Sequence, residues 1–376
     1  MSKLVALDLP GGPAFVAALR RVWDRGDAAF PLDQRLPAPA RAQVLAVNRP
    51  GAVIDAEGAE SALDAGLPVE PGDALVVATS GTTGEPKGVV LTHDAVAASA
   101  TATSERIGTT STDHWLACLP LSHVGGLSVV TRALVMGTEL TVLPSAAPSA
   151  IERAAKAGAT LVSLVATALH RIDPTLFRVI LLGGSRPPLH RPANAITTYG
   201  MTETGSGVVY DGRALQGVEV RIDDHGEVHL RGPMLLRCYR DGVDPKDSDG
   251  WLATGDLGSW RADGRLHVEG RRGDLIITGG ENVWPEAVEA VLADLDDVSD
   301  VAVAGLPDEE WGTLVTAFVV PRDPARPPTL AELRGAVKER LPAYCAPRRV
   351  LVVTEIPRTA LGKIRRGELR VSVPPG

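Results

Sequence analysis

Short apolar runs alternate with segments of helical spacing through the first half of the chain. Runs typical of buried strands occur at 75–77, 115–119, 161–165, 179–182 and 195–199, and a further candidate at 44–47. Apolar residues recur at helical spacing at 14–23, 94–107, 127–135 and 151–157, with Thr92 or Asp94 as a cap of the second helix. Strand runs without polar alternation, when helices separate them, are typical of a parallel sheet covered on both faces. The pattern therefore predicts an α/β fold.

The pattern changes twice further along. Short runs at 218–222, 227–230 and 266–269 are joined by Asp/Gly turns, which is typical of a small antiparallel β subdomain. After residue 272, helical segments at 285–292 and 330–341 alternate with strand runs at 301–304, 314–320 and 350–353. We therefore expect a large N-terminal domain over 1–272 and a small, mobile α+β C-terminal domain over 273–376.

Composition narrows the class of protein. The 376 residues carry a net charge of −8, which argues against a general nucleic-acid or anionic-membrane binder. The three cysteines, Cys118, Cys238 and Cys345, lie far apart and lack the spacing of metal ligands. No apolar run approaches the length of a membrane span or a signal peptide. We expect a cytoplasmic protein.

A loop of small residues follows the strand run at 75–77. It consists of Thr79, Ser80, Gly81, Thr82, Thr83 and Gly84, and Lys87 and Gly88 come shortly after it. Many backbone N–H groups and hydroxyls in little space, with one lysine as a point charge, suit an oligophosphate. The Walker pattern is absent, because Glu85 and Pro86 separate the second glycine from the lysine. The alternative is a flexible surface loop. Against it, only 6 of the 38 basic residues of the chain are lysines, and one of these is Lys87.

A carboxylate follows another predicted strand in the segment from Tyr199 to Thr204. Ligands bind at the carboxyl ends of strands in open α/β sheets, and Mg²⁺ prefers carboxylate and phosphate oxygens. Glu203 is therefore a candidate Mg²⁺ ligand, Tyr199 a flat face for a base and Thr202 a hydroxyl for a phosphate. Alternatively, Thr202 caps a helix and Glu203 complements its dipole.

Four weaker candidates each have a structural alternative. The glycines of Gly183-Gly184-Ser185 would let a flat ring approach the backbone, or they form a turn. Asp256 would bind two ribose hydroxyls, or it is a turn residue. His123 would line an acyl pocket, or it is a core histidine. Lys363 would neutralise an anionic transition state from a mobile domain, or it is a surface lysine.

Seven motifs occur together in this chain. They are T-S-G-T-T-G-E-P-K-G at 79–88, P-L-S-H at 120–123, Y-G-M-T-E-T at 199–204, T-G-D-L at 254–257, G-R-R-G-D-L-I-I-T-G-G-E-N-V-W-P at 270–285, P-D-E-E-W-G at 307–312 and P-R-T-A-L-G-K-I at 357–364. In this order and from about residue 72 onward, the chain resembles the adenylate-forming superfamily of acyl-CoA synthetases, luciferases and nonribosomal-peptide adenylation domains.

The resemblance implies a two-step reaction that uses ATP, Mg²⁺ and coenzyme A. A carboxylate would attack ATP to form acyl-AMP and pyrophosphate, and the CoA thiol would then displace AMP. The residues implied to bind ATP are Thr79, Ser80, Gly81, Thr82, Thr83, Gly84, Lys87, Gly183, Gly184, Ser185, Tyr199, Gly200, Met201, Asp256 and Arg271. Lys363, Thr202 and His123 would be catalytic, Glu203 would bind Mg²⁺, and Gly279, Gly280 and Glu281 would face a CoA tunnel. Gly273 would be the hinge, where many relatives carry Asp, Lys or Ser.

The short chain looks most like the o-succinylbenzoate–CoA ligases of menaquinone biosynthesis. Ser122, His123 and Ser206 are the candidate pocket residues for such an acid. One alternative is another aryl or medium-chain acid, and another is transfer of the acyl group to a carrier-protein thiol. A catalytically silent relative is disfavoured by the presence of Lys363, Glu203 and Asp256. We expect small-molecule partners, no nucleic acid, no membrane span and, as one arrangement, a homodimer.

Overall fold

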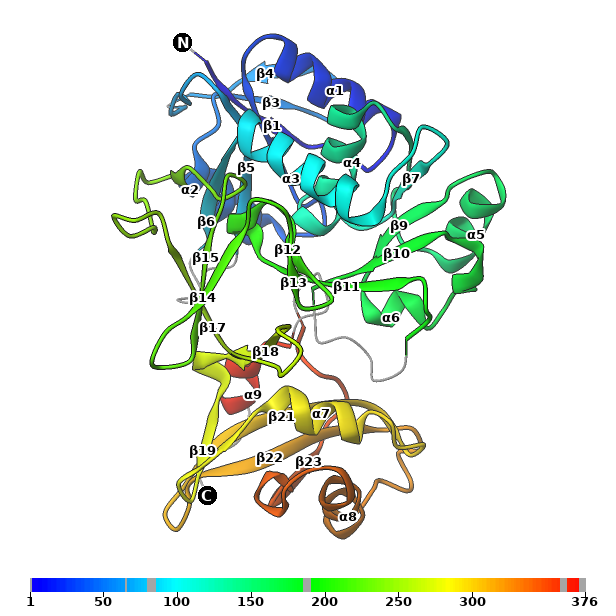
Figure 1. The fold of residues 1–376 in the computed structure, drawn as a ribbon, viewed down its shortest axis with the longest axis vertical. Helices are drawn as coiled ribbons and strands as arrows, with labels where there is room; N and C mark the ends of the chain where they lie inside the picture. Colours follow the sequence, from blue (N-terminus) through cyan, green and yellow to red (C-terminus); the bar gives the residue numbers. More distant parts are fainter. Residues whose placement is uncertain (1, 65, 80–85, 185–190, 359–363, 372–376) are drawn as a thin grey trace. The chain divides into compact units, whose positions relative to one another are not determined.

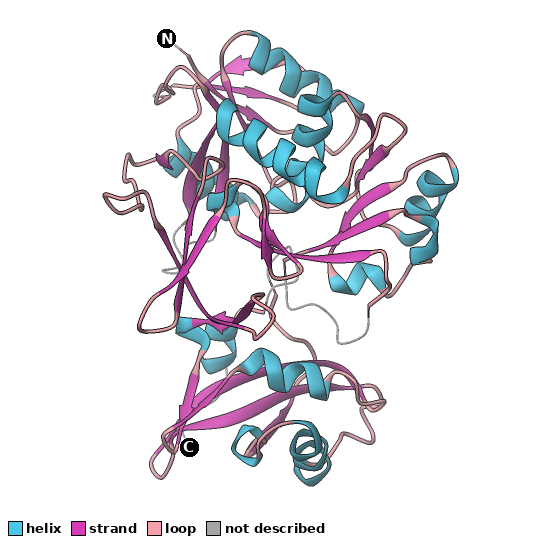
Figure 2. Ribbon diagram, viewed as in Figure 1, coloured by secondary structure: helices cyan, strands magenta, loops and turns pink. Residues whose placement is uncertain are grey.

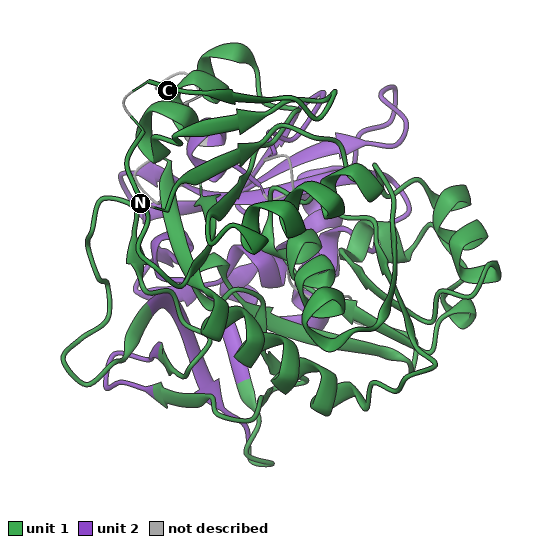
Figure 3. Cartoon of the chain, turned by 90° about the horizontal axis from the view of Figure 1, so that it is seen from above, with its two compact units in different colours: residues 1–221, 229–253, 262–266 green, residues 222–228, 254–261, 267–376 purple. Residues whose placement is uncertain are grey.

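The computed structural model describes residues 2–64, 66–79, 86–184, 191–358 and 364–371. The chain divides into two compact units, which Figure 3 distinguishes by colour. Unit 1 comprises residues 1–221, 229–253 and 262–266, and unit 2 comprises residues 222–228, 254–261 and 267–376. The domain boundary expected at Arg272–Gly273 stays a prediction.

Unit 1 contains two seven-stranded sheets (Figures 1 and 2). The first has the order β16-β6-β5-β2-β1-β3-β4, and its strands are β1 (Leu4–Leu7), β2 (Ala28–Pro31), β3 (Ala52–Ile54), β4 (Glu60–Ala62), β5 (Asp73–Thr79), β6 (Lys87–Thr92) and β16 (Cys238–Tyr239). The neighbours β5, β2, β1 and β3 pair in parallel, and the strands at both edges pair antiparallel. Every residue of β1 and β2 is buried, which explains their uninterrupted apolar sequence.

The second sheet has the order β13-β12-β11-β10-β9-β7-β8. Its strands are β7 (His114–Ala117), β8 (Glu139–Val142), β9 (Leu161–Leu164), β10 (Val179–Leu182), β11 (Ala195–Gly200), β12 (Gly207–Tyr210) and β13 (Arg213–Ala214). The five strands from β8 to β11 are parallel, and β12 and β13 are antiparallel. The predicted parallel strands are therefore present, with antiparallel strands added at one edge.

Helices cover these sheets and pack between them. The helices of unit 1 are α1 (Pro13–Asp24), α2 (Ala38–Asn48), α3 (His93–Ile107), α4 (Val124–Met136), α5 (Pro148–Lys156) and α6 (Ala166–Leu169). Helix α3 packs on β5 and β6, α4 packs on β7, β8 and β9, and the two helices pack on each other (Figure 1). Thr92 is the cap of α3, since its side-chain oxygen accepts a hydrogen bond from the Ala95 N–H at 3.1 Å.

The strand expected at 44–47 is wrong, because these residues lie in α2. The helix has a proline in its first turn, ends at Arg49 in a left-handed conformation, and contains four alanines. Two valines suggested a strand, but alanine-rich flanks and the N-terminal proline favour a helix.

The remaining strands form three smaller sheets. A four-stranded sheet has the order β14 (Glu219–Ile222), β15 (Glu227–Arg231), β17 (Leu252–Trp260) and β18 (Leu266–Arg271), which follows the chain. A hairpin consists of β19 (Ile276–Thr278) and β20 (Glu281–Val283), and a three-stranded sheet consists of β21 (Val298–Asp308), β22 (Gly312–Pro321) and β23 (Arg349–Val352). Strands β17, β19 and β20 were not predicted from the sequence.

The C-terminal part of unit 2 is the predicted α+β structure. Its helices are α7 (Pro285–Leu292), α8 (Leu330–Arg340) and α9 (Arg366–Val371). Strands β21 and β22 are antiparallel and β22 and β23 are parallel, with α7 packed on β21 and on α8. Within the described ranges of the whole chain, no helix is long and apolar enough to cross a membrane.

Candidate active site

The candidate phosphate loop joins two antiparallel strands. Thr79 at the end of β5 pairs with Lys87 at the start of β6. The intervening Ser80, Gly81, Thr82, Thr83 and Gly84 lie outside the described residues. A Cβ at Gly88 would lie 1.9 Å from Asn48 Oδ1 and 2.9 Å from Arg240 Cβ. The close packing of Asn48 and Arg240 against β6 therefore requires a glycine at position 88.

The turn after β11 presents Glu203. A 3₁₀ turn covers Thr202–Thr204, and the Thr204 side chain accepts a hydrogen bond from the Met201 N–H at 2.9 Å. The N-cap residue of this turn is Met201, so Thr202 lies inside the turn and is not its cap. A Cβ at Gly200 would lie 2.2 Å from Ser206 O, so a glycine is required at the β-bulge that ends this strand.

Glu203 has a partner that was not predicted from the sequence. The Tyr239 hydroxyl donates a hydrogen bond to Glu203 Oε1 at 3.0 Å, and Lys87 Nζ lies 4.8 Å from the centroid of the Tyr239 ring. Strand β16 carries this tyrosine to the edge of the first sheet, where Tyr239 pairs with Val89. The structure thereby brings together the predicted metal ligand and the predicted phosphate-binding lysine. Only the pairing of β16 with β6 reveals this arrangement.

The candidate adenine-binding segment follows β10. A Cβ at Gly183 would lie 2.8 Å from the hydroxyl of Thr198, and Gly184 has a φ of +83°. Both positions therefore favour glycine. Tyr199 lies on the neighbouring strand β11, two residues after Ala195–Thr197, the part of that strand in register with β10. Ser185 lies outside the described residues.

The three candidate pocket residues differ in their surroundings. Ser122 is buried, and the His123 side chain is one quarter exposed. His123 Nε2 lies 3.4 Å from Asp33 Oδ2, and Arg35 also binds this carboxylate. Burial raises the pKa of Asp33, but the contact with His123 and the hydrogen bonds from Arg35 hold it well below the usual range. Asp33 was not identified from the sequence.

Ser206 is buried against α3. Its hydroxyl oxygen lies 2.6 Å from that of Ser99, a residue of this helix. The contact gives Ser206 a clear packing role, and its role toward substrate stays a prediction.

Helix α4, which begins directly after His123, carries a buried cation. The Arg132 side chain is among the largest fully buried ones, and its guanidinium lies 4.9 Å from the centroid of the Trp115 ring. Its Nε and Nη1 atoms make no hydrogen bond to the described residues. Burial lowers the pKa of this guanidinium. A lone arginine in an apolar helix was the only sequence signal for it.

Asp256 forms a separate polar site in unit 2. It lies within strand β17 and is buried, and its Oδ1 lies 3.0 Å from Arg271 Nε. The Asp256 N–H donates to the Thr254 hydroxyl at 3.1 Å, and Arg271 Nη1 donates to the Thr254 carbonyl at 2.5 Å. Asp256 is thus a strand residue with a preformed arginine partner. The turn-residue alternative is wrong.

The segment expected to face CoA is a tight hairpin. Gly279 and Gly280 form the two-residue loop between β19 and β20, with φ angles of +55° and +84°, and Glu281 pairs with Thr278. Two positive φ angles require glycines in such a loop. A Cβ at Gly279 would also lie 2.9 Å from the Trp311 ring. By contrast, a Cβ at Gly273 would contact nothing within 4 Å, so the expected hinge position accepts larger residues.

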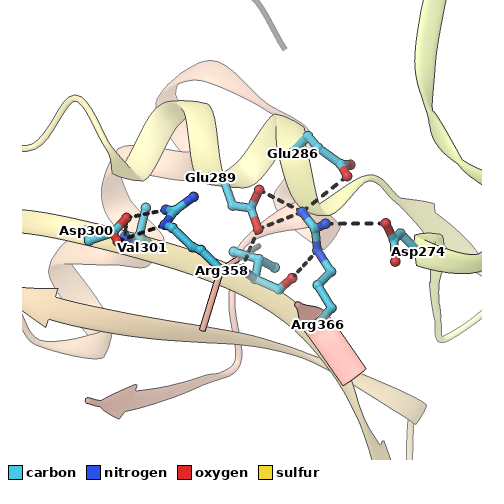
Figure 4. A network of polar contacts seen from close by, with 8 residues as sticks. Asp274, Glu286, Glu289, Asp300, Val301, Arg358 and Arg366 are labelled. Carbon is cyan, nitrogen blue, oxygen red and sulfur yellow. Dashed lines mark hydrogen bonds and ion pairs between the residues drawn. The ribbon is translucent and has the colours of Figure 1, made fainter. Parts of the chain in front are cut away.

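Lys363 lies outside the described residues, but ion pairs hold the chain on both sides of 359–363 (Figure 4). Arg358 Nη2 donates to Asp300 Oδ1 at 2.6 Å. Arg366, whose side chain is 6% exposed, binds both oxygens of Glu289 at 2.8 Å (Figure 4). Its guanidinium also lies 3.2 Å from Glu286 Oε1 and 3.3 Å from Asp274 Oδ2.

Three carboxylates therefore surround one guanidinium in this cluster. Burial raises the pKa of Glu289 to about 7 although Arg366 opposes the shift, and repulsion by Glu286 adds to it. A carboxyl whose pKa is higher in the folded state binds its proton more tightly there than in the unfolded chain. Its contribution to stability is therefore lost as pH rises from the unfolded toward the folded pKa.

We expect the free energy of unfolding to fall by about 2 kcal/mol more in the wild type than in Glu289→Gln between pH 5 and 7.5. Urea unfolding of the full chain at both pH values measures this difference. The control is Glu339→Gln, which removes an exposed carboxylate from α8. Equal pH dependence in the wild type and in Glu289→Gln would show that Glu289 does not titrate in this range.

Comparison with known proteins places these sites in a family. The sequence profile of the AMP-binding enzyme matches residues 66–240, and that of the AMP-binding enzyme C-terminal domain matches residues 287–363. A probable 2-succinylbenzoate–CoA ligase from Mycobacterium tuberculosis is 39% identical, over 88% of this chain and 93% of that protein. The chain belongs to the AMP-binding enzyme family.

Further similar proteins, one found by sequence and one by structure, also belong to this class of ligase. The 2-succinylbenzoate–CoA ligase of Listeria monocytogenes is 35% identical, over 79% of this chain and 69% of that protein. The o-succinylbenzoate CoA synthetase of Bacillus subtilis, solved with its acyl-adenylate intermediate, has a TM-score of 0.88 and 29% identity. That match covers 98% of this chain and 88% of the solved chain.

These comparisons confirm several predictions for this AMP-binding enzyme. The family, the α/β fold with a large N-terminal and a small C-terminal part, and the ligase class are as predicted. The motifs at 79–88 and 199–204 lie within the first matched range, and Lys363 ends the second. The roles of individual residues stay predictions.

Proposed function

We propose that this enzyme converts 2-succinylbenzoate, ATP and CoA into the CoA thioester, AMP and pyrophosphate, as a step of menaquinone biosynthesis. The observation that carries the proposal is the 39% identity to a probable 2-succinylbenzoate–CoA ligase over 93% of the length of that relative. The B. subtilis enzyme has been solved with the adenylate of this acid and, separately, with ATP and magnesium.

The first step joins the succinyl carboxylate to the α-phosphorus of ATP. A carboxylate oxygen forms a bond to this phosphorus, the bond to the bridging oxygen of the β-phosphate breaks, and pyrophosphate leaves. Both reactants are anionic, so positive charge and positioning provide most of the catalysis. Lys87 would hold the leaving phosphates, Thr202 the α-phosphate, and Lys363 would lie between the two reacting anions.

The residues around Glu203 suit a magnesium ion. Its carboxylate is half-buried and accepts a hydrogen bond from the neutral Tyr239 hydroxyl at 3.0 Å. Carboxylate oxygens are hard ligands that Mg²⁺ accepts together with phosphate oxygens and water. When bound, the ion would neutralise phosphate charge.

Asp256 and Arg271 suit a ribose. The Asp256 carboxylate is positioned by Arg271 Nε at 3.0 Å and provides acceptors for two hydroxyl donors. Tyr199 and the backbone at Gly183 would contact the adenine.

In the second step, the CoA sulfur forms a bond to the acyl carbon and AMP leaves with the electrons of the broken C–O bond. The thiol proton goes to solvent. The hairpin at Gly279, Gly280 and Glu281 would contact the pantetheine chain, after rotation of the C-terminal part at Gly273.

A release assay tests the function directly. We expect pyrophosphate release and thioester formation with 2-succinylbenzoate, at a kcat/KM about a hundredfold above that with benzoate or medium-chain fatty acids. Pyrophosphate is measured by a coupled assay, with and without CoA, and the thioester by mass spectrometry. Absence of release with 2-succinylbenzoate would contradict the proposal. Release without a thioester would indicate a carrier-protein thiol as acceptor.

A further inference from the structure

Strand β16 connects the turn that carries the candidate metal ligand to strand β6, which begins at Lys87. On one side, the Leu236 N–H donates to the Glu203 carbonyl at 2.7 Å. On the other, the Arg237 N–H donates to the Val90 carbonyl at 2.9 Å and the Arg240 N–H to the Gly88 carbonyl at 2.7 Å. The backbone around Tyr239 is therefore fixed relative to both Glu203 and β6.

Buried contacts of Arg240 fix this strand further. Its side chain donates to the Asn48 carbonyl at 3.0 Å and to the Pro68 carbonyl at 2.9 Å, and also to the Leu67 carbonyl. These acceptors belong to the end of α2 and to the segment before β5. Tyr239 consequently lies on a segment that hydrogen bonds within the protein hold in place.

Two contacts of the Tyr239 side chain with described residues differ in kind. Its hydroxyl donates to Glu203 Oε1 at 3.0 Å, so the hydrogen bond fixes one carboxylate oxygen. Its ring lies 4.8 Å from Lys87 Nζ, a distance at which the ring face attracts an ammonium group. The hydroxyl therefore orients the carboxylate, and the ring limits where the lysine can go.

We infer that Tyr239 is a positioning residue for divalent-metal binding at Glu203, an inference that rests on the proposed function. With Oε1 held by the hydroxyl, the other carboxylate oxygen is oriented for a cation. Removing a hydrogen-bonding partner of a metal ligand typically costs about 10-fold to 100-fold in metal affinity. The ring contact with Lys87 acts on the nucleotide phosphates and is independent of the metal.

Two substitutions separate these contacts. Tyr239→Phe removes the hydroxyl and keeps the ring, whereas Tyr239→Leu removes both. Mn²⁺ binding to the full-length protein with a non-hydrolysable ATP analogue is measured by electron paramagnetic resonance. Analogue binding in EDTA is measured by calorimetry. Tyr344→Phe, at an exposed tyrosine, is the matched control, and thermal unfolding checks that each variant is folded.

We expect Tyr239→Phe to raise the Mn²⁺ dissociation constant about tenfold and to leave analogue binding in EDTA unchanged. Tyr239→Leu should weaken both. A folded Tyr239→Phe variant with wild-type Mn²⁺ affinity would overturn the inference. So would a Tyr239→Phe variant in which Mn²⁺ binding and analogue binding in EDTA are weakened equally. If the wild type itself binds no analogue with or without Mn²⁺, the proposed function fails instead, because neither measurement needs the acid or CoA.

Discussion

Lys363→Ala is expected to slow acyl-adenylate formation about a thousandfold, the size of effect found when one group that stabilises a developing negative charge is removed. The reaction brings a carboxylate and a triphosphate together, and a lysine between them neutralises charge that increases in the transition state. Thioester formation from preformed acyl-adenylate should change less than threefold, because no phosphoryl transfer occurs in that step. The two half-reactions are measured separately, by pyrophosphate release and by consumption of added acyl-adenylate.

The matched control for this prediction is Lys338→Ala. Lys338 is an exposed lysine near the end of α8, so its loss changes the net charge equally. An equal decrease of both half-reactions in Lys363→Ala would contradict the proposal that Lys363 acts in the first step only. It would indicate a general loss of folded enzyme or a role of Lys363 in both steps.

Asp256→Ala is expected to lower kcat/KM for ATP about a hundredfold. A hydrogen bond to a charged group contributes about 1.5–3 kcal/mol, and a ribose offers two hydroxyl donors. The wild type should therefore discriminate strongly against 2′-deoxy-ATP and 3′-deoxy-ATP, and the variant should discriminate weakly. Comparing the three nucleotides with both proteins gives a thermodynamic cycle that isolates the contact.

Asp263→Ala provides the control, because Asp263 is an exposed turn aspartate close in sequence. It should retain wild-type discrimination between ATP and the deoxynucleotides. Unchanged discrimination in Asp256→Ala would place the ribose elsewhere and leave Asp256 a structural partner of Arg271.

Most of the elements that local sequence predicted lie near their observed bounds. Strand β10 and helix α7 begin and end at the predicted residues, because a buried apolar run and an amphipathic pattern with an N-terminal proline are strong local signals. Helix α2 was misread, since two valines in four residues cannot outweigh helix-favouring flanks. Strand β17 was missed because Gly255 and Asp256 resemble a turn until the neighbouring strands are in place.

The residues missed at the site share one property: their partners are distant in the sequence. Tyr239 contacts Glu203 and Lys87, and Asp33 contacts His123. Neither Tyr239 nor Asp33 belongs to a motif that carries the family resemblance. Nothing in their local sequence indicates these contacts, which arise only when strands and loops come together in the folded unit.

The sequence by itself determined the fold class, the family and the order of the motifs, because hydrophobic periodicity and motif spacing are local properties of the chain. The tertiary structure decided which residues support those motifs. It paired β16 with β6, which brought Tyr239 to Glu203. It also showed that Thr202 lies inside its turn rather than at the cap, and that Asp256 lies in a strand against Arg271. Such contacts depend on strand register and packing between distant segments, which a single sequence does not specify.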